Sequence, residues 1–76
     1  MFLEALILTP REVIFQDKVR NVILPGEKGV FEILPYHKSI VSRLIKGKVI
    51  AGGKEFPIKR GIVKVEANKA TIIVER

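Results

Sequence analysis

Hydrophobic and polar residues alternate along the chain with the period of β-strands, and no stretch of useful length places apolar residues at helical spacing. Turn-forming residues recur roughly every eight to twelve positions, which is typical of all-β domains. We therefore predict an all-β fold, a flattened β-sandwich or barrel of about eight to ten short, mostly antiparallel strands. The predicted strands are Phe2–Leu8, Glu12–Phe15, Lys18–Leu24, Val30–Leu34, Ser39–Ile45, Lys48–Ala51, Lys54–Ile58, Ile62–Glu66 and Ala70–Val74.

Short runs of turn-forming residues separate these strands. The run Leu24-Pro25-Gly26-Glu27 fits a type II turn, because proline presets φ at the second position and glycine supplies a positive φ at the third. Gln16-Asp17 is predicted to be another turn. The remaining residues that we assign to turns or strand breaks are Gly29, Pro35–His37, Lys46-Gly47, Gly52, Gly53, Gly61 and Ala67–Lys69.

The strongest hairpin signal is the glycine pair Gly52-Gly53, which lies between two alternating strands. Two glycines suit the positive φ angles of a two-residue primed turn. The second arm of this hairpin contains Pro57, which cannot donate a hydrogen bond to a neighbouring strand. We therefore predict that Lys54–Ile58 is an edge strand.

Several predicted strands are apolar on both faces, namely Leu6–Leu8, Val22–Leu24, Ile62-Val63 and Ile72–Val74. A two-layer sandwich needs only its inner face to be apolar. The additional apolar residues indicate either a surface that binds another protein or an outer face that crossed sheets or barrel closure cover. The sequence leaves both interpretations open.

The 76 residues are enough for a single domain, residues 1–76, with one core. The longest apolar runs, such as Ala5–Leu8, are far shorter than the ~20 residues of a spanning helix. The formal net charge is +6, and basic residues concentrate between Arg43 and Arg60, where Glu55 is the single acid. This segment is either a solvated edge that opposes aggregation or a surface for an anionic partner.

Few residues could carry chemistry. The chain has no cysteine, and its one histidine, His37, has Ser39 nearby and a single aspartate, Asp17, far away in sequence. Their spacing does not indicate a nucleophile–base–acid arrangement, and the scattered carboxylates show no metal-ligand spacing. We expect no catalytic residue, no metal and no cofactor.

A small basic β-barrel that binds single-stranded nucleic acid is the alternative hypothesis. Such proteins combine a basic groove with aromatic residues on which bases stack. Phe56 is the one aromatic residue of the basic segment, and a core position explains it equally well. The loop Gly26–Gly29 lacks the context of a phosphate-binding loop.

The run Pro25–His37 resembles the amino-terminal β-sandwich domain of the epsilon subunit of F-type ATP synthase. That family has, loosely, Pro-Gly, two variable residues, Gly, a hydrophobic stretch and then Leu-Pro-Gly-His. Pro10 to Phe15, Phe56 to Val65 and Asn68 to Val74 are similar to further elements of the same domain, so the resemblance covers nearly the whole chain. Glu32 and Tyr36 stand where the family usually has glycine.

The resemblance implies a non-catalytic subunit of the rotating central stalk. It implies that the domain docks the gamma subunit to the membrane c-ring and couples ion-driven rotation to ATP synthesis. The location implied is peripheral, on the cytoplasmic face of the energy-coupling membrane, without membrane insertion and without a nucleic-acid partner. The chain ends at Arg76, directly after the last predicted strand, so the inhibitory helical hairpin that often follows in this family is not carried over.

Contact residues follow from the same resemblance. The loop around His37 matches the ring-facing end of the family domain, and the implied c-ring contacts are Val30, Tyr36, His37 and Lys38. The strands that are apolar on both faces suggest where the gamma subunit docks. The gamma contacts that we expect are Val22, Ile62 and Ile73, and the sequence leaves open whether gamma docks on the Leu6–Leu8 face or on the Ile72–Val74 face.

Overall fold

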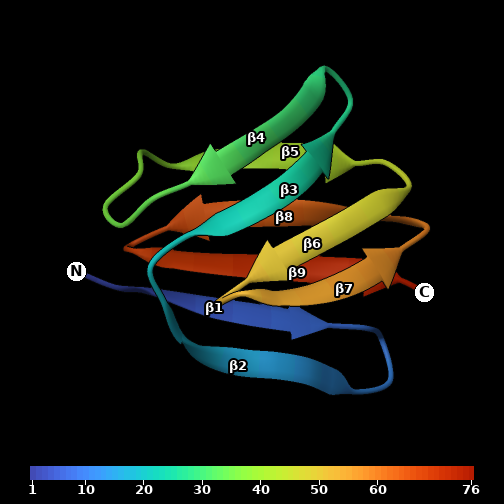
Figure 1. Cartoon of the computed structure of the whole chain (residues 1–76), viewed down its shortest axis with the longest axis horizontal. Coiled ribbons are helices and arrows are strands. Elements are labelled where there is room, and N and C mark those ends of the chain that lie inside the picture. The colour runs from blue at the N-terminus through green and yellow to red at the C-terminus, as the bar shows by residue number, and fades with distance from the viewer.

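The computed structural model describes all residues from Met1 to Arg76 and contains nine strands and no helix (Figure 1). No helix that could cross a membrane is therefore present. The strands are β1 (Leu3–Leu8), β2 (Val13–Val19), β3 (Val22–Gly26), β4 (Gly29–Ile33), β5 (Ile40–Leu44), β6 (Gly47–Ala51), β7 (Lys54–Ile58), β8 (Arg60–Glu66) and β9 (Lys69–Glu75). The predicted all-β class is confirmed.

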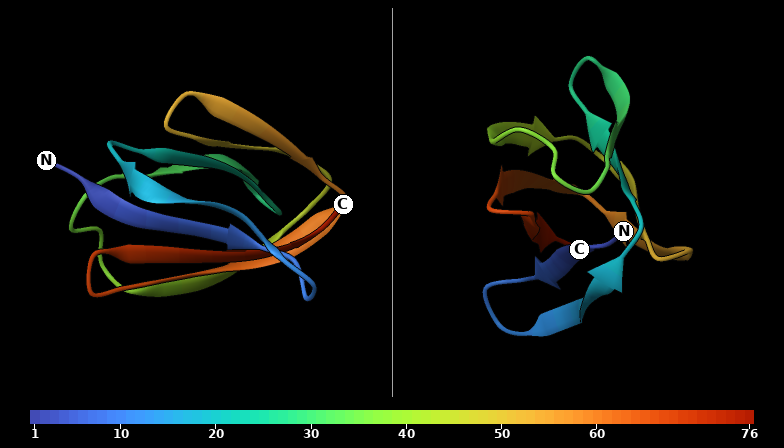
Figure 2. Two further views of the ribbon diagram at one scale, coloured as in Figure 1. Left: turned by 90° about the horizontal axis from the view of Figure 1, so that it is seen from below. Right: turned by 90° about the vertical axis from the view of Figure 1, so that its left-hand side faces the viewer.

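The strands form one curled sheet in the order β2-β1-β9-β8-β5-β3-β6-β7. β5 and β6 share one edge of β3, and β4 pairs with the opposite edge. All pairings are antiparallel except the one between β1 and β9, which is parallel. The curl places β3, β4, β6 and β7 as one layer over the layer of β1, β9, β8 and β5 (Figure 2). A sandwich-like half-barrel results.

The core lies between these two layers. It is a single cluster of 16 buried hydrophobic residues, and no polar or charged residue is buried. Along most strands more buried and more exposed side chains alternate, as the pleat of a β-strand requires, whereas the bulged β2 and the end of β3 depart from this pattern. In β1, for example, Leu3, Ala5 and Ile7 are buried while Glu4 is exposed.

Strand β2 corrects the prediction of a turn at Gln16-Asp17. Both residues lie inside β2, which pairs with β1 from Val13 to Val19, and the chain turns instead at Arg20-Asn21. The predicted strand Lys18–Leu24 is therefore two strands. The Asp17 carboxylate accepts a hydrogen bond from the Lys18 amide at 2.8 Å, so the Asp17 side chain satisfies the backbone donor of the next residue at an edge of the sheet.

Strand β3 corrects the prediction of a type II turn at Pro25-Gly26. Both residues are buried in β3, and the chain reverses at the following two residues. The missing N–H of Pro25 is tolerated because β3 passes there from β6 to β5, and the Pro25 carbonyl accepts the Ile45 amide at 2.8 Å. Gly26 is needed for space rather than for a positive φ, since a Cβ would lie 2.7 Å from Cε1 of Phe31.

Two other hairpins turn where the sequence places them. Gly52 and Gly53 connect β6 to β7 with φ angles of 57° and 78°, and Ala67-Asn68 connects β8 to β9 with φ angles of 49° and 58°. Strand β7, which contains Pro57, lies at the end of the sheet order, so the predicted edge position is confirmed.

The sheet does not close into a barrel, because its two terminal strands, β2 and β7, do not pair. Aromatic packing fills this seam instead. The rings of Phe15 in β2 and Phe56 in β7 lie 5.4 Å apart between centroids, at a tilt of 54°. The Lys54 ammonium covers the Phe15 ring at 5.9 Å. Phe56 is thus part of the structure of the domain and packs against the core.

Gly61 was predicted to break the chain before a strand, but it is the second residue of β8. A Cβ at this position would lie 2.5 Å from the carbonyl oxygen of Ile73 and 3.1 Å from Cγ1 of Val74. Glycine is therefore required for the close approach of β8 to β9.

We predict that Gly61→Ala lowers the free energy of unfolding by about 1–3 kcal/mol, because the added methyl group overpacks the contact with β9. Chemical denaturation measures this change. The matched control is Gly53→Asn, where a Cβ meets no atom within 4 Å and asparagine accepts a positive φ. Equal losses in both variants would contradict the assignment of Gly61 to strand contact.

Candidate docking surfaces

An apolar stripe crosses the outer face of the layer formed by β1, β9 and β8. Leu8 pairs with Ile73, Ile73 pairs with Ile62, and Leu8 also pairs with Val13 of β2. Cross-strand partners project from the same side of a sheet, so these four side chains form one row. Ile62 is 41% exposed and Ile73 43%. We call Leu8, Val13, Ile62 and Ile73 the outer stripe.

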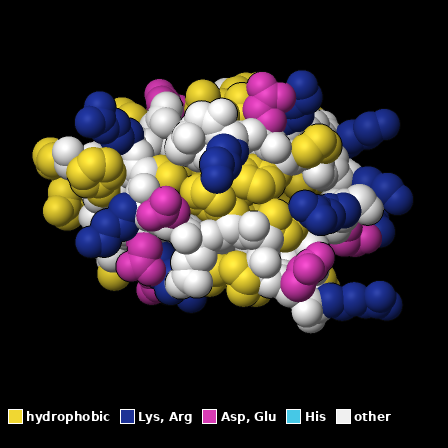
Figure 3. Space-filling view, turned by 60° about the horizontal axis from the view of Figure 1, so that its bottom comes forward, with side chains coloured by type: hydrophobic (Ala, Val, Ile, Leu, Met, Phe, Trp, Pro, Cys, Tyr) yellow, Lys and Arg dark blue, Asp and Glu magenta, His cyan; other side chains and the backbone are white.

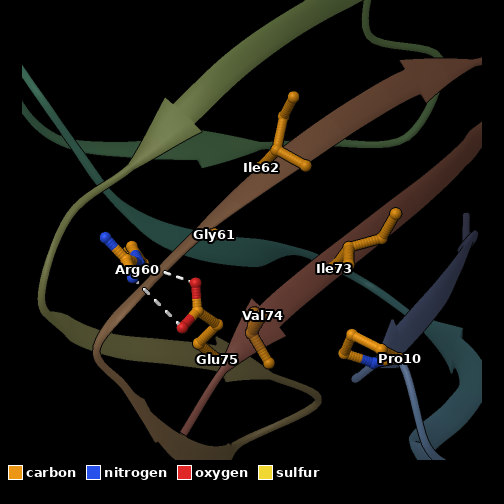
Figure 4. A pocket seen from close by; sticks show the side chains of 7 residues that line it. All are labelled: Pro10, Arg60, Gly61, Ile62, Ile73, Val74 and Glu75. Carbon is orange, nitrogen blue, oxygen red and sulfur yellow. Dashed lines mark hydrogen bonds and ion pairs between the residues drawn. The ribbon is translucent and has the colours of Figure 1, made fainter.

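A shallow hollow of about 290 Å³ lies beside the outer stripe (Figure 4). Ile62 and Ile73 form one side of it, Gly61 contributes a stretch of bare backbone, and Pro10 lies across from them. Arg60 and Glu75 lie next to each other at one edge (Figure 4). The hollow therefore combines an apolar lining with a charged rim, which is the arrangement typical of protein-binding surfaces.

The two charged residues of the rim, Arg60 and Glu75, form an ion pair. Arg60 Nε donates to Glu75 Oε2 at 2.6 Å, and its Nη2 donates to Oε1 at 3.4 Å. The hydrogen bond and the charge of Arg60 lower the pKa of the Glu75 carboxyl, and Glu75 in turn raises the pKa of Arg60. Lys59 lowers the pKa of Glu75 further through its charge. Both side chains are exposed, so water weakens the pair.

A second surface follows strand β4 and the loop after it. Val30 and Tyr36 are 75% and 68% exposed, Lys38 is exposed and His37 is half-buried. These four residues do not form one cluster, because Val30 is the second residue of β4, close to the hairpin turn, whereas Tyr36 to Lys38 follow the opposite end of the strand (Figure 1). Val30 and the Tyr36 loop are therefore two separate exposed sites at the two ends of β4.

Asn68 holds the Tyr36 loop in place. Its side-chain oxygen accepts the Tyr36 amide at 2.7 Å, and its side-chain nitrogen donates to the Phe2 carbonyl at 2.9 Å. The Asn68 carbonyl accepts the Glu4 amide at 3.1 Å. Tyr36 itself has a φ of 62°, which is uncommon outside glycine and requires such support. One residue of the β8–β9 turn therefore joins the N-terminal segment to this loop.

The residues considered for chemistry lie apart. The His37 ring contacts the Lys38 carbonyl at 2.7 Å through Nδ1, and the Asp17 carboxylate binds the Lys18 amide. No side-chain hydrogen bond joins His37, Ser39 and Asp17 to one another. The structure holds no group of three or more side chains that could ligate a metal.

The basic segment Arg43–Arg60 does not form a single patch. Lys46 and Lys59 lie in connections at one end of the domain, whereas Lys54 follows the Gly52-Gly53 turn at the other end. Lys48 is paired with Glu55 at 3.0 Å. In Figure 3, Lys and Arg side chains project most densely from one end, while hydrophobic side chains gather in the middle of the visible face.

The structure separates the three expected gamma contacts. Ile62 and Ile73 are neighbours in the outer stripe, but Val22 is completely buried in the core, so the expectation for Val22 was wrong. From the sequence, the Leu6–Leu8 face was one of two possible docking faces, but Leu8 itself was not selected, and Val13 was not selected either. Leu8 belongs to a run that is apolar on both faces and could have been found, whereas a β-bulge between Ile7 and Leu8 hides the register of Val13.

Comparisons with known proteins identify the family. Residues 3–76 match the family model described as the ATP synthase, Delta/Epsilon chain, beta-sandwich domain. The chain belongs to this family. The resemblance drawn from the sequence is therefore confirmed over nearly the whole chain.

Curated relatives of the family carry the name ATP synthase epsilon chain. The chain is 45% identical to the protein from a Sulfurovum species, with 91% of this chain and 58% of the relative covered. It is 42% identical to that of a Nitratiruptor species, with 91% and 57% covered. For Chlorobium limicola the identity is 35%, with 91% and 84% covered. The chain thus spans a little over half the length of the first two relatives.

Solved structures of the same fold come from mitochondrial ATP synthases. A chain of the Tetrahymena thermophila central stalk/c-ring structure superimposes with a TM-score of 0.83 at 17% identity, covering 96% of this chain and 63% of that one. A chain of the Euglena gracilis OSCP/F1/c-ring structure gives 0.88 at 21% identity, covering 99% and 51%. At these identities the likeness concerns the fold.

The Arg60–Glu75 pair gives a pH prediction. Because the pKa of Glu75 in the folded chain is lowered, the pair stabilises the fold above the ordinary carboxyl pKa, and this stabilisation is lost as the pH falls through the lowered value. We expect Arg60→Gln to raise the pKa of Glu75, and Lys59→Gln to raise it less, in a carboxyl NMR titration from about pH 7 to about pH 2. A larger effect of Lys59→Gln would contradict the pairing.

Proposed function

We propose that this domain is a non-catalytic module of the central stalk of an F-type ATP synthase. In this role it docks the gamma subunit to the membrane c-ring and transmits ion-driven rotation to ATP synthesis. The observation that carries the proposal is the outer stripe, an apolar row with a charged rim on a domain of the ATP synthase epsilon-chain family. The proposed location is the cytoplasmic face of the energy-coupling membrane.

The gamma subunit is proposed to cover the outer stripe. More than a third of the surface of Ile62 and of Ile73 is exposed to water, and neither residue belongs to the hydrophobic core. Burial of such side chains against a partner is favourable by roughly 25 cal/mol per Å² of apolar surface. The neighbouring hollow would accept an apolar side chain of the partner, and the Arg60–Glu75 pair would border it.

The c-ring is proposed to contact Val30 near the start of β4 and Tyr36, His37 and Lys38 in the loop after its end. Support comes from their exposure along β4 and its following loop, and from the anchoring of this loop by Asn68. An anchored loop loses little conformational entropy on binding. The contact requires shape and polarity, and no proton transfer is assigned to His37.

Binding to purified gamma subunit tests the proposal. Light scattering of the mixture is expected to give a one-to-one complex at low salt and at high salt, because burial of apolar surface does not depend on ionic attraction. Ile62→Glu and Ile73→Glu are expected to weaken binding at least about tenfold by placing a charge in the interface.

The matched control is Ile45→Glu, because Ile45 is an isoleucine of similar exposure, 46%, that lies in the β5–β6 turn outside the outer stripe. It is expected to bind like the unsubstituted chain. Absence of a complex at either salt concentration would overturn the proposal. A complex that Ile45→Glu weakens as much as Ile73→Glu would place gamma elsewhere on the domain.

A further inference from the structure

Strand β4 has an open edge with unpaired backbone groups. The β3–β4 hairpin turns over two residues, so Gly26–Gly29 is its first hydrogen-bonded pair, and bonded and non-bonded pairs alternate from there. Pro25–Val30 and Ile23–Glu32 are then the non-bonded pairs. The N–H and C=O groups of Val30 and Glu32 therefore point away from β3, where no strand pairs with β4.

No other group of the protein occupies this edge. The backbone hydrogen bonds outside the strand ladders do not involve Val30 or Glu32, and the side-chain bonds use only the carboxylate of Glu32, which accepts the Asn21 amide group at 2.7 Å. β4 lies at the outside of the molecule, with no strand beyond it (Figures 1 and 2).

Of the other strands with a free edge, β2 and β7 at the ends of the sheet order are protected against pairing, as soluble sheets usually are. Strand β5 pairs with β3 only at Leu44 and also leaves part of one edge open. Strand β2 is bulged near Val13, uses its Asp17 carboxylate on the Lys18 amide, and faces the aromatic seam. Strand β7 follows a two-residue turn as β4 does, so Glu55 and Pro57 are its outward residues. Pro57 removes one of the two outward donors.

Strand β4 resembles β7 but has no proline to protect its open edge. Lys54-Glu55-Phe56-Pro57-Ile58 of β7 and Gly29-Val30-Phe31-Glu32-Ile33 of β4 share phenylalanine and isoleucine at the inward positions, and Glu32 stands where β7 has its proline. The outward donors of β4 are therefore both present. Val30, at 75% exposure, adds an uncovered β-branched side chain next to them.

We propose that β4 pairs with β4 of a second copy of this chain, in an antiparallel and two-fold symmetric manner. With Phe31 at the two-fold axis, Val30 of one copy lies opposite Glu32 of the other. The outward N–H of each residue then meets the outward C=O of its opposite number, so the edge is complementary to itself. Glu32 lies opposite valine and not opposite a second glutamate, which avoids direct repulsion of like charges.

The pairing is weak and depends on salt. Two five-residue strands bury less than about 1,000 Å², which is below the size of stable interfaces. Each copy also carries a net charge of +6, so the copies repel each other at low ionic strength. Salt screens this repulsion and strengthens the pairing, in contrast to its effect on binding of a nucleic acid.

Self-pairing would cover the open edge of β4 at Val30. Its consequence for assembly rests on the proposed function, in which Val30 contacts the c-ring. The free chain would hide part of its c-ring contact in a dimer, and the dimer would have to dissociate before assembly. The hydrogen-bonding edge of an unassembled chain would thereby be kept from other sheets. The pairing itself is measured on the chain alone, so it stands or fails independently of the stalk assignment.

Sedimentation velocity from about 10 μM to about 1 mM chain, at low and high salt, tests the proposal. We expect a reversible monomer–dimer equilibrium that tightens with salt. Glu32→Pro copies the protection of β7 into β4 and is expected to weaken the dimer at least about tenfold, because it removes half of the inter-copy hydrogen bonds. Glu32→Ala is the matched control, since it also loses the carboxylate and the Asn21 contact but keeps the N–H.

Amide NMR locates the contact and separates it from misfolding. The Val30 and Glu32 amide signals are expected to shift with concentration while those of β7 do not, and Glu32→Pro should retain the dispersed spectrum of the folded sheet. If Glu32→Pro fails to fold, Val30→Pro with Val30→Ala as its control replaces it. A monomer at every concentration and salt, or equal dimerisation of the proline and alanine variants, would overturn the proposal.

Discussion

The pairing of β9 with both β1 and β8 is the constraint on which the other features depend. β9 joins β1 in parallel and β8 in antiparallel register, so the first and last strands of the chain lie side by side in the layer of β1, β9, β8 and β5. Its inward residues, such as Ile72, complete the core. Its outward residue Ile73 brings Leu8 and Ile62 into one row. The same pairing therefore builds the core and the outer stripe.

Local chemistry made part of this fold predictable. The Gly52-Gly53 hairpin and the edge position of Pro57 depend on backbone preferences of a few adjacent residues. The predictions at Gln16-Asp17 and Pro25-Gly26 were wrong because both pairs consist of residues that are common in turns, whereas each pair lies inside a strand. In β2 the edge accepts polar residues, and in β3 the missing donor of Pro25 faces a corner between two strands.

The candidate surfaces were predictable only in part, because long-range register decides which apolar residues face outward. Val22 and Ile73 look alike in sequence, each within an apolar run, yet one is buried and the other is on the outer face. Asn68 gave no signal beyond a turn, since its partners Phe2 and Tyr36 are far from it in sequence. The family resemblance could be read from the ordered set of turn and strand residues between Pro10 and Val74.

The central claim is that gamma docks on the outer stripe, and isoleucine methyl NMR of the chain mixed with purified gamma subunit tests it most directly. The account predicts that the methyl signals of Ile62 and Ile73 shift or broaden on binding, while those of the exposed Ile45 and the buried Ile72 stay nearly unchanged. A change at Ile45 with Ile62 and Ile73 unaffected would contradict the account, because gamma would then bind a part of the domain surface outside the outer stripe.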